Sequence, residues 1–196
     1  MLSREAIISE MKGRGYAVFE NGDYNLNIVG LRRQPGTANA FDDLIVVFYK
    51  VGGAWAMECF PCTTDPGTYW LLNPSRVNGT AILCPGQYRS SHKVGYHHAG
   101  QPTQYPALVQ NTPLQVWRDN NKDSVIDYAG PVLTDVQGLN IHHAGQNSTV
   151  IDKWSAACQV IASMSNWTRF WALIVEGSKR YGPTFTYTLL DWPYGF

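Results

Sequence analysis

The sequence LIVVFYKVGGAWAMECF, residues 44–60, carries the clearest fold signal in the chain. Its first six residues are apolar and mostly β-branched or aromatic, which favours a buried strand. Gly52 and Gly53 then interrupt the apolar pattern, and two glycines between two such runs are typical of a β-hairpin. The segment therefore predicts a hairpin from which a sheet is built.

Short segments with the same character lie on both sides of this hairpin. Further strands are predicted at Asn25–Arg33, Thr80–Cys84, Ala107–Gln110, Leu114–Arg118 and Thr184–Leu190. Short strands bounded by Pro, Gly or Asn indicate a sandwich or a barrel. Ser3 caps a predicted helix that reaches about Arg14, and apolar residues on one face predict a long helix at 165–180. We expect a mainly β sandwich or barrel with an N-terminal helix and one long helix near the C-terminus.

Composition limits the size and the partners of the protein. The chain has 196 residues, of which 44% are hydrophobic and 15% charged, so we expect a single domain (1–196) with residues 1–20 as a helical extension. Lys plus Arg and Asp plus Glu are balanced at 15 each, which gives no indication of nucleic acid as a partner. No apolar run approaches 18 residues, so no membrane span is expected. The oligomeric state is left open.

The N-terminal residues and the cysteines indicate the cellular compartment in which the chain is made. Charged residues at positions 4, 5, 10 and 12 interrupt the apolar core that an export signal needs, so we expect synthesis in the cytoplasm without a signal peptide. Four cysteines in a chain of this length do not predict a disulfide scaffold. Cys59 and Cys62 form a C-x-x-C, but the segment alternates like a strand and is expected to hold free thiols.

His142 and Cys158 are the best candidates for covalent chemistry. A short apolar run at 139–141 predicts a strand that ends at His142, and small residues at 155–157 leave room for a substrate carbonyl beside the sulfur. A thiol needs a neighbouring base because the thiolate is the nucleophile, and imidazole is such a base. The backbone N–H groups of Ala157 and Cys158 are the expected oxyanion donors. The alternative is that Cys158 is a small core residue.

The segment I-H-x(12)-S-x-A-C, residues 141–158, resembles the signature of L,D-transpeptidase catalytic domains. This resemblance implies Cys158 as the nucleophile, His142 as the general base and Ser155 as the residue that shapes the turn before the nucleophile. The sequence differs from the family where Ala157 replaces a glycine and where Gln159 and Val160 replace Ile-Arg. A weaker similarity lies upstream, in CTTDPGTYWL at residues 62–71.

The resemblance implies acyl transfer on peptidoglycan stem peptides through a Cys158 thioester. No cofactor is required for that chemistry, and hydrolysis is favoured over cross-linking. Such an enzyme would reach the cell wall after lysis or as part of a phage particle. We place His143, Gln159 and His97 among the residues that contact the substrate. The competing hypothesis is a non-catalytic structural or wall-binding module of a larger phage assembly.

A loop with alternating polar residues resembles the start of an EF-hand calcium loop. Its predicted ligands are Asp119, Asn121, Asp123, Val125 and Asp127. Oxygen ligands at alternate positions suit Ca²⁺, which would act as a structural clip. The turn glycine and the final glutamate of such loops are absent, and a polar hairpin loop without metal explains the same residues.

Two further groups of polar residues, the histidine segment at 90–98 and the charged pairs near residues 32–43, each have a structural interpretation, and the histidine segment also has a chemical one. Ser90, His92 and Gly95 resemble the start of the zinc D,D-peptidase motif, which makes a zinc hydrolase that uses His92 a second alternative. Otherwise the histidines of this segment are expected to lie in a loop near the cleft. The charged pairs at 32–33 and 42–43 flank a Pro-Gly loop, and we expect them to be solvated.

Overall fold

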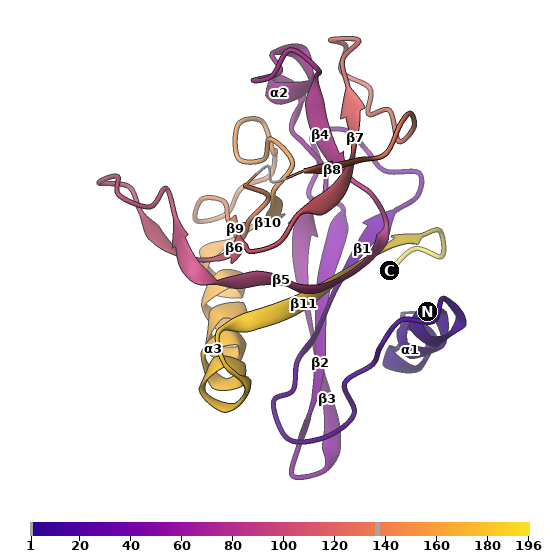
Figure 1. Cartoon of the computed structure of the whole chain (residues 1–196), viewed down its shortest axis with the longest axis vertical. Coiled ribbons are helices and arrows are strands. Elements are labelled where there is room, and N and C mark those ends of the chain that lie inside the picture. The colour runs from indigo at the N-terminus through magenta and orange to yellow at the C-terminus, as the bar shows by residue number, and fades with distance from the viewer. Residues whose placement is uncertain (1, 136–137) are drawn as a thin grey trace.

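The computed structural model describes residues 2–135 and 138–196. Within these residues eight strands close into a barrel in the order β1-β11-β5-β6-β9-β10-β3-β2, and β4-β7-β8 form a separate sheet at one end of it (Figure 1). Strands account for 40% of the chain and helices for 17%, which confirms the predicted mainly β architecture with its N-terminal and C-terminal helices.

The strands are β1 (Asn27–Arg33), β2 (Asp43–Val51), β3 (Ala54–Thr63), β4 (Thr80–Leu83), β5 (Gly86–His97), β6 (Tyr105–Gln110), β7 (Leu114–Asp119), β8 (Leu133–Asp135), β9 (Ile141–His143), β10 (Gln159–Ile161) and β11 (Thr184–Trp192). The helices are α1 (Arg4–Gly13), α2 (Thr68–Leu72) and α3 (Met164–Tyr181).

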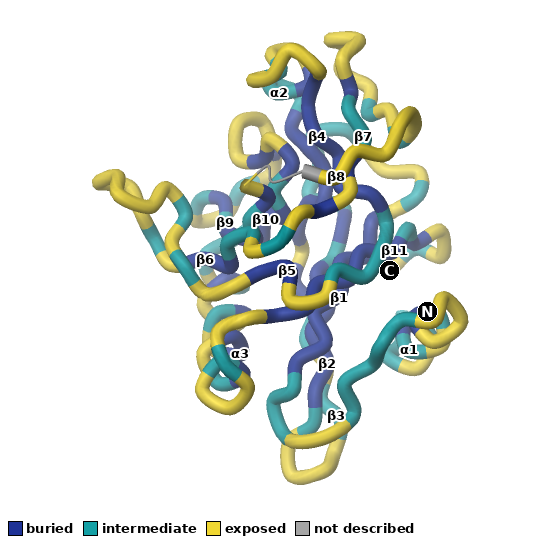
Figure 2. Tube along the Cα trace, viewed as in Figure 1, coloured by how far each residue is buried: buried dark blue, intermediate teal, exposed yellow. Residues whose placement is uncertain are grey.

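The β2–β3 hairpin forms as predicted. Val51 pairs with Ala54, and Gly52 and Gly53 make the turn with φ values of 58° and 80°, which cost glycine little. The neighbouring strand β1 is buried on both faces, because Ile28 packs inside the barrel and Val29 packs under α1. Figure 2 shows the resulting buried centre of the barrel.

Both predicted helices begin at serine caps and cover the barrel. Ser3 Oγ accepts a hydrogen bond from the Ala6 N–H, and Ser163 Oγ accepts one from the Asn166 N–H. The buried face of α3 packs against β3, β9 and β10, where Phe170 meets Phe60 edge to face with ring centroids 5.6 Å apart. In the described part of the chain, no helix is long and apolar enough to cross a membrane.

The histidine segment is a strand, not the loop that we expected. Both His92 and His97 lie on β5, which pairs with β11 on one side and with β6 on the other. A strand with one buried face usually shows alternating apolar residues in the sequence. This strand does not, because two of its buried residues, Ser91 and His92, are polar. Hydrogen bonding inside the fold compensates for their polarity.

Arg32 is completely buried, which contradicts the expectation of a solvated charge. Its Nε lies 3.0 Å from the Asp65 carboxylate, and its guanidinium donates to the carbonyls of Thr64 and Leu83. The ring of Tyr128 lies 5.0 Å from the guanidinium, and its hydroxyl donates to Asp65. The charge is tolerated inside because a carboxylate and carbonyl oxygens replace the lost water.

Asp43 is buried beside this ion pair, also contrary to expectation. It accepts hydrogen bonds from the N–H of Arg33 and from both the N–H and the hydroxyl of Thr64. Burial, with the neighbouring charge of Asp65, raises the pKa of Asp43 to about 7. The network thereby joins β1 and β2 to the turn after β3.

Removing the buried cation should destabilise the fold strongly. The Arg32→Met substitution leaves Asp65 without its counter-charge, so we expect a loss of about 3 to 5 kcal/mol in the free energy of unfolding. The neighbouring Arg33→Met is the matched control, because that side chain is exposed and should change stability by about 0.5 kcal/mol or less. Urea titration measures both. Equal effects of the two substitutions would contradict a structural role for the buried pair.

Candidate functional site

His142 lies on β9, and Cys158 immediately precedes the adjacent parallel strand β10. β9 and β10 are in register with His142 opposite Val160, and the Gln159 N–H donates to Asn140 O one step earlier. Paired residues of adjacent strands share a face of the sheet, so Val160 lies on the same face as His142, and Cys158 lies one residue before β10. The opposite face, with Ile141, belongs to the barrel core. The strand pairing thus places the start of β10 beside Asn140, two residues before His142.

The tautomer of His142 is set by the backbone carbonyl of the next residue, His143. Its Nδ1 lies 2.9 Å from the carbonyl oxygen of His143 and 3.0 Å from the hydroxyl of Tyr105. A carbonyl oxygen can only accept, so Nδ1 carries the proton and donates it, and Nε2 holds a lone pair. Nε2 is buried and has no hydrogen-bond partner within the described residues. An unpartnered basic nitrogen is what a general base requires.

His97 supports the His142 ring from one side. The two rings are stacked with centroids 4.0 Å apart and an angle of 16° between their planes, and His97 Nδ1 accepts a hydrogen bond from the Asn140 amide. Burial lowers the pKa of His142 to about 3 and that of His97 to about 4. Both rings are therefore neutral near pH 7. His97, a predicted substrate contact, here packs against the His142 ring, and its contact with substrate stays a prediction.

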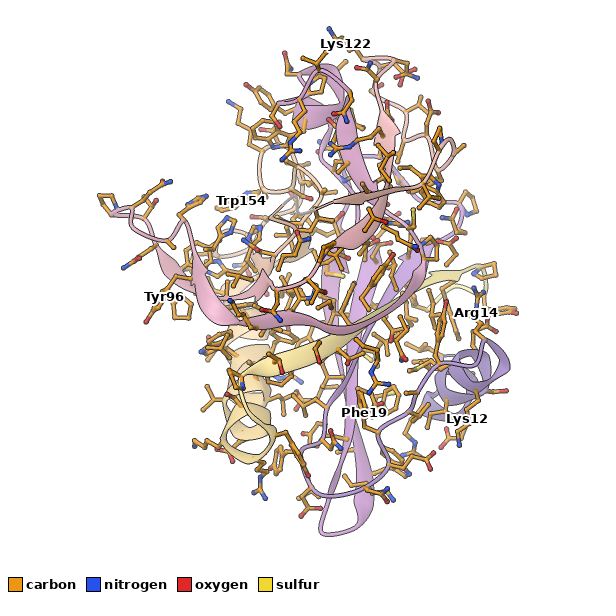
Figure 3. All side chains as sticks on the ribbon, in the orientation of Figure 1. Lys12, Arg14, Phe19, Tyr96, Lys122 and Trp154 are labelled. Carbon is orange, nitrogen blue, oxygen red and sulfur yellow. The ribbon has the colours of Figure 1, made fainter. Side chains whose placement is uncertain are left out.

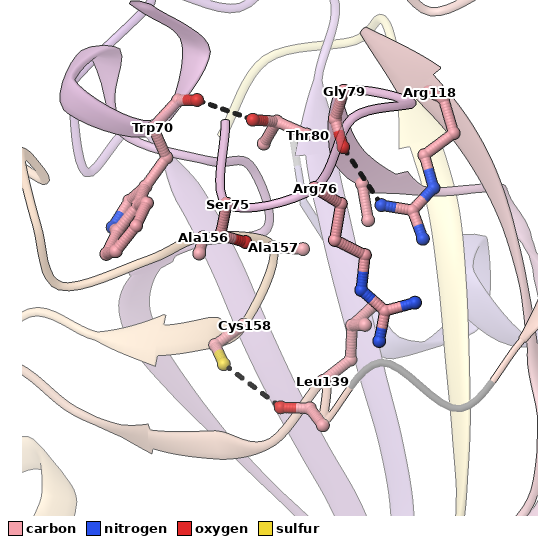
Figure 4. A pocket seen from close by; sticks show the side chains of 12 residues that line it. Trp70, Ser75, Arg76, Gly79, Thr80, Arg118, Leu139, Ala156, Ala157 and Cys158 are labelled. Atoms are coloured by element: carbon pink, nitrogen blue, oxygen red, sulfur yellow. Dashed lines mark hydrogen bonds between the residues drawn. The ribbon is translucent and has the colours of Figure 1, made fainter. Parts of the chain in front are cut away.

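Cys158 is a half-buried free thiol. Its Sγ donates to the carbonyl of Gly138 at 3.5 Å (Figure 4). Among the described residues, no hydrogen bond joins Cys158 to His142. Burial raises the pKa of the thiol to about 11. At rest the Cys158 thiol and the His142 imidazole are accordingly both neutral, and the thiol proton must leave when the sulfur attacks.

The turn before Cys158 is held by Ser155. Its buried Oγ accepts from the Ala157 N–H at 3.2 Å and donates to the Cys158 carbonyl at 2.8 Å, which agrees with the expected turn-shaping role. Ala157 has φ of 141°, a conformation that glycine adopts more readily. Because the Ala157 N–H is engaged, it is not an oxyanion donor as we expected, and the N–H of Cys158 is the remaining candidate.

Gln159 points into the barrel and does not contact the pocket. It is fully buried, accepts a hydrogen bond from the Tyr187 hydroxyl at 2.7 Å and donates to the carbonyls of Thr64 and Ala157. Gly30 makes room for this ring, since a Cβ there would lie 1.9 Å from the Tyr187 hydroxyl oxygen. The expected substrate contact is thus a core hydrogen bond that fixes the strand after Cys158.

Residues 67–70, in the segment with the weaker motif similarity, contact the loop that precedes Cys158. The Gly67 N–H donates to Ser155 O at 2.8 Å, and a Cβ on Gly67 would lie 2.0 Å from Asp152 O, so only glycine fits. The Trp70 indole of α2 donates to Lys153 O at 3.1 Å. Residues 67–70 therefore hold the loop that precedes Cys158.

A pocket lies between this loop and the three-stranded sheet. Figure 4 shows the indole of Trp70 on one side of it and the side chains of Arg76 and Arg118 on the other. Its lining residues are Trp70, Ser75, Arg76, Gly79, Thr80, Ala81, Arg118, Gly138, Leu139, Ala156, Ala157 and Cys158. The sequence did not identify the arginines or Tyr105 as site residues, because contacts between segments far apart in the sequence bring them to this end of the barrel.

Two other predicted site histidines lie away from the sulfur. The ring of His143 packs against Tyr105 and Trp167, with centroids 4.2 and 5.5 Å away. His92 is buried, with Nε2 donating to Leu139 O at 3.0 Å and Nδ1 next to the Ser91 hydroxyl at 2.9 Å. Neither nitrogen of His92 is left for the zinc ion that the second alternative requires.

The predicted calcium loop is closed by its own hydrogen bonds. The Asn121 amide donates to Asp127, the Asp127 N–H donates to Asp119, and the Val125 N–H donates to Asp123. Across the described residues, no three His, Cys, Asp or Glu side chains are grouped as metal ligands would be. These contacts suit a metal-free loop, although Asp119 Oδ1 is buried without a hydrogen-bond partner there. Calcium binding stays a prediction.

Comparison with protein-family models, with curated proteins and with solved structures finds no match to this chain. The chemistry of the site is accordingly inferred from its geometry and from the motif similarity.

Proposed function

We propose that the chain is a cysteine-dependent acyltransferase that forms a thioester on Cys158. The observation that carries the proposal is the His142 ring, whose Nδ1 proton is held by the His143 carbonyl while the buried Nε2 stays unpartnered. The ring lies on β9, next to the strand that begins one residue after Cys158. Thiol activation needs a fixed tautomer with a free basic nitrogen within reach of the thiol.

The reaction follows from the neutral resting state. As Sγ attacks an amide carbonyl, the thiol proton moves to His142 Nε2, and the developing imidazolium keeps its Nδ1–H bond to the His143 carbonyl. The C–N bond then breaks, and the imidazolium returns the proton to the leaving amine. Water or an amine next attacks the thioester, which yields a carboxylic acid or a new amide and restores the thiol.

Peptidoglycan stem peptides are the proposed acyl donors, and hydrolysis is favoured over cross-linking. The substrate class rests on the similarity of residues 141–158 to L,D-transpeptidases. The φ value of Ala157 supports it, because the backbone there has the conformation suited to the glycine that this family carries. The Ser155 turn and the docking of Gly67 on it agree with the same motif.

Product analysis tests this function. Purified muropeptides are incubated with the protein, with and without an added amine acceptor, and the products are separated by liquid chromatography with mass detection. We expect peptides shortened by hydrolysis, and transfer products when the acceptor is abundant. The absence of both kinds of product would contradict the proposal.

One observation favours a second candidate, a wall-binding module without catalysis. Trp154, in the loop before Cys158, is 43% exposed, and Tyr96 on the β5–β6 hairpin is 54% exposed (Figure 3). Exposed aromatic rings stack well on sugar rings, and the resting thiol is protonated. Sedimentation of the protein with intact cell walls, without any product in the assay above, is the outcome that selects this candidate.

A further inference from the structure

We propose that Tyr105 is a positioning residue for His142. Its hydroxyl, together with the His143 carbonyl, holds the protonated Nδ1 edge of the imidazole and so keeps Nε2 available for the thiol proton. The inference rests on the proposed function for the reaction that His142 serves. It adds a residue that lies outside the motif at 141–158 and acts through the base.

Strand pairing brings Tyr105 to His142. Strand β6 begins at Tyr105 and lies between β5 and β9 in the barrel (Figure 1). It runs antiparallel to β9, with Leu108 paired to Ile141. The start of β6 therefore lies beside the end of β9, where His142 and His143 stand.

The hydroxyl of Tyr105 makes two contacts at the Nδ1 edge of the base. Its Oη lies 3.0 Å from His142 Nδ1 and 3.3 Å from the His143 carbonyl oxygen, which is itself 2.9 Å from Nδ1. The carbonyl oxygen has no proton, so it accepts from both Nδ1 and the hydroxyl. The hydroxyl oxygen is in turn a second acceptor for the Nδ1 proton. Two oxygens thus fix this edge of the ring.

The ring of Tyr105 is held separately from its hydroxyl. Its centroid lies 4.2 Å from that of His143 and 5.3 Å from that of His97, the residue that stacks on His142. Phenylalanine keeps these ring contacts and removes only the oxygen. The Tyr105→Phe substitution therefore tests the hydroxyl without removing the packing.

The hydroxyl should stabilise the charged base more than the neutral one. Burial raises the pKa of the Tyr105 phenol, and the charge of a Cys158 thiolate would raise it further, so the phenol stays neutral near pH 7. When His142 takes the thiol proton, its Nδ1–H becomes a charged donor, and hydrogen bonds from charged donors are stronger. Loss of the hydroxyl should therefore lower kcat and leave KM unchanged.

A double-mutant cycle tests whether Tyr105 acts through His142. In the otherwise wild-type protein, Tyr105→Phe should lower kcat by about tenfold with KM unchanged. In the His142→Ala protein, the same substitution should change the residual rate at pH 9 by less than about twofold, because the group that it supports is absent. General damage from the lost hydroxyl would lower the rate equally in both proteins.

Tyr88→Phe is the matched control. Tyr88 is also half-buried, and its hydroxyl also donates to a backbone carbonyl, that of Cys84 at 2.6 Å. It lies on β5 and is not among the residues that line the pocket at Cys158. Its substitution removes a bond of the same kind and should leave kcat unchanged.

Proton exchange provides a readout that needs no turnover. The Nδ1 proton of His142 should give a slowly exchanging proton NMR resonance, which is assigned by its loss in His142→Ala. It should exchange with water about tenfold faster in Tyr105→Phe, because one of its two acceptors is gone. In Tyr88→Phe the exchange rate should not change.

Three results would overturn the positioning role. They are a wild-type protein without this resonance, an exchange rate that Tyr105→Phe leaves unchanged, and a kcat that Tyr105→Phe leaves unchanged or lowers equally with and without His142. If the wild-type protein forms no product, the proposed function fails, and the exchange rate alone decides whether Tyr105 holds His142.

Discussion

Replacing His142 by alanine should lower the rate of acyl transfer by about 10² to 10⁴, whereas replacing His143 should cost less than tenfold. The reason is the position of the two rings. The Nε2 of His142 is buried without a hydrogen-bond partner among the described residues, whereas the His143 ring packs against Tyr105 and Trp167. The contribution of His143 is its backbone carbonyl, which alanine retains.

The pH dependence separates loss of a base from general damage. Burial lowers the pKa of His142 to about 3 and raises that of Cys158 to about 11, so neither group titrates near neutrality and wild-type kcat/KM should be flat there. Without the base only the free thiolate reacts, and with a pKa of about 11 only about one thiol in 10⁴ is ionised at pH 7. The residual rate of His142→Ala should rise about tenfold per pH unit up to about pH 11.

Steady-state kinetics of the two variants from pH 6 to 10 provide the measurement. If His143→Ala is the damaging change and His142→Ala is mild, the assignment of the base is wrong by one residue. A flat pH profile for His142→Ala would likewise show that the ring does not remove the thiol proton.

The Cys158→Ala protein should have no detectable activity on muropeptides while keeping its fold. The substitution removes only the sulfur of a half-buried side chain, so the free energy of unfolding should change by about 1 kcal/mol or less. Cys59→Ala is the matched control, because Cys59 is also a half-buried free cysteine but lies on β3, outside the pocket. It should retain full activity.

Local sequence patterns predicted the parts of the fold that depend on neighbouring residues. The Gly52-Gly53 turn, the serine cap at Ser3 and the apolar face of the C-terminal helix each involve a few adjacent positions, and each is found. The catalytic pairing of His142 with Cys158 stays a prediction that rests on motif similarity. Spacing alone does not specify that β9 and β10 lie side by side.

Buried polar residues were the main source of wrong predictions. Arg32, His92 and Gln159 have side chains that are usually exposed, yet each is buried with hydrogen-bond partners from segments far away in the sequence. Composition and periodicity carry no signal for such long-range partners, because a buried polar residue and a solvated one look alike in a single sequence. The same limit hid Tyr105 and the two pocket arginines.

The most direct test of the account is the mass of the protein during turnover. The wild-type protein is mixed with a muropeptide substrate and the reaction is quenched with acid after short times. The masses of the intact protein and of its proteolytic peptides are then measured by mass spectrometry. The account predicts a mass increase equal to the acyl fragment on the peptide that contains Cys158, and no increase in Cys158→Ala. Product formation by Cys158→Ala at the wild-type rate, with no adduct on the wild-type protein, would contradict it.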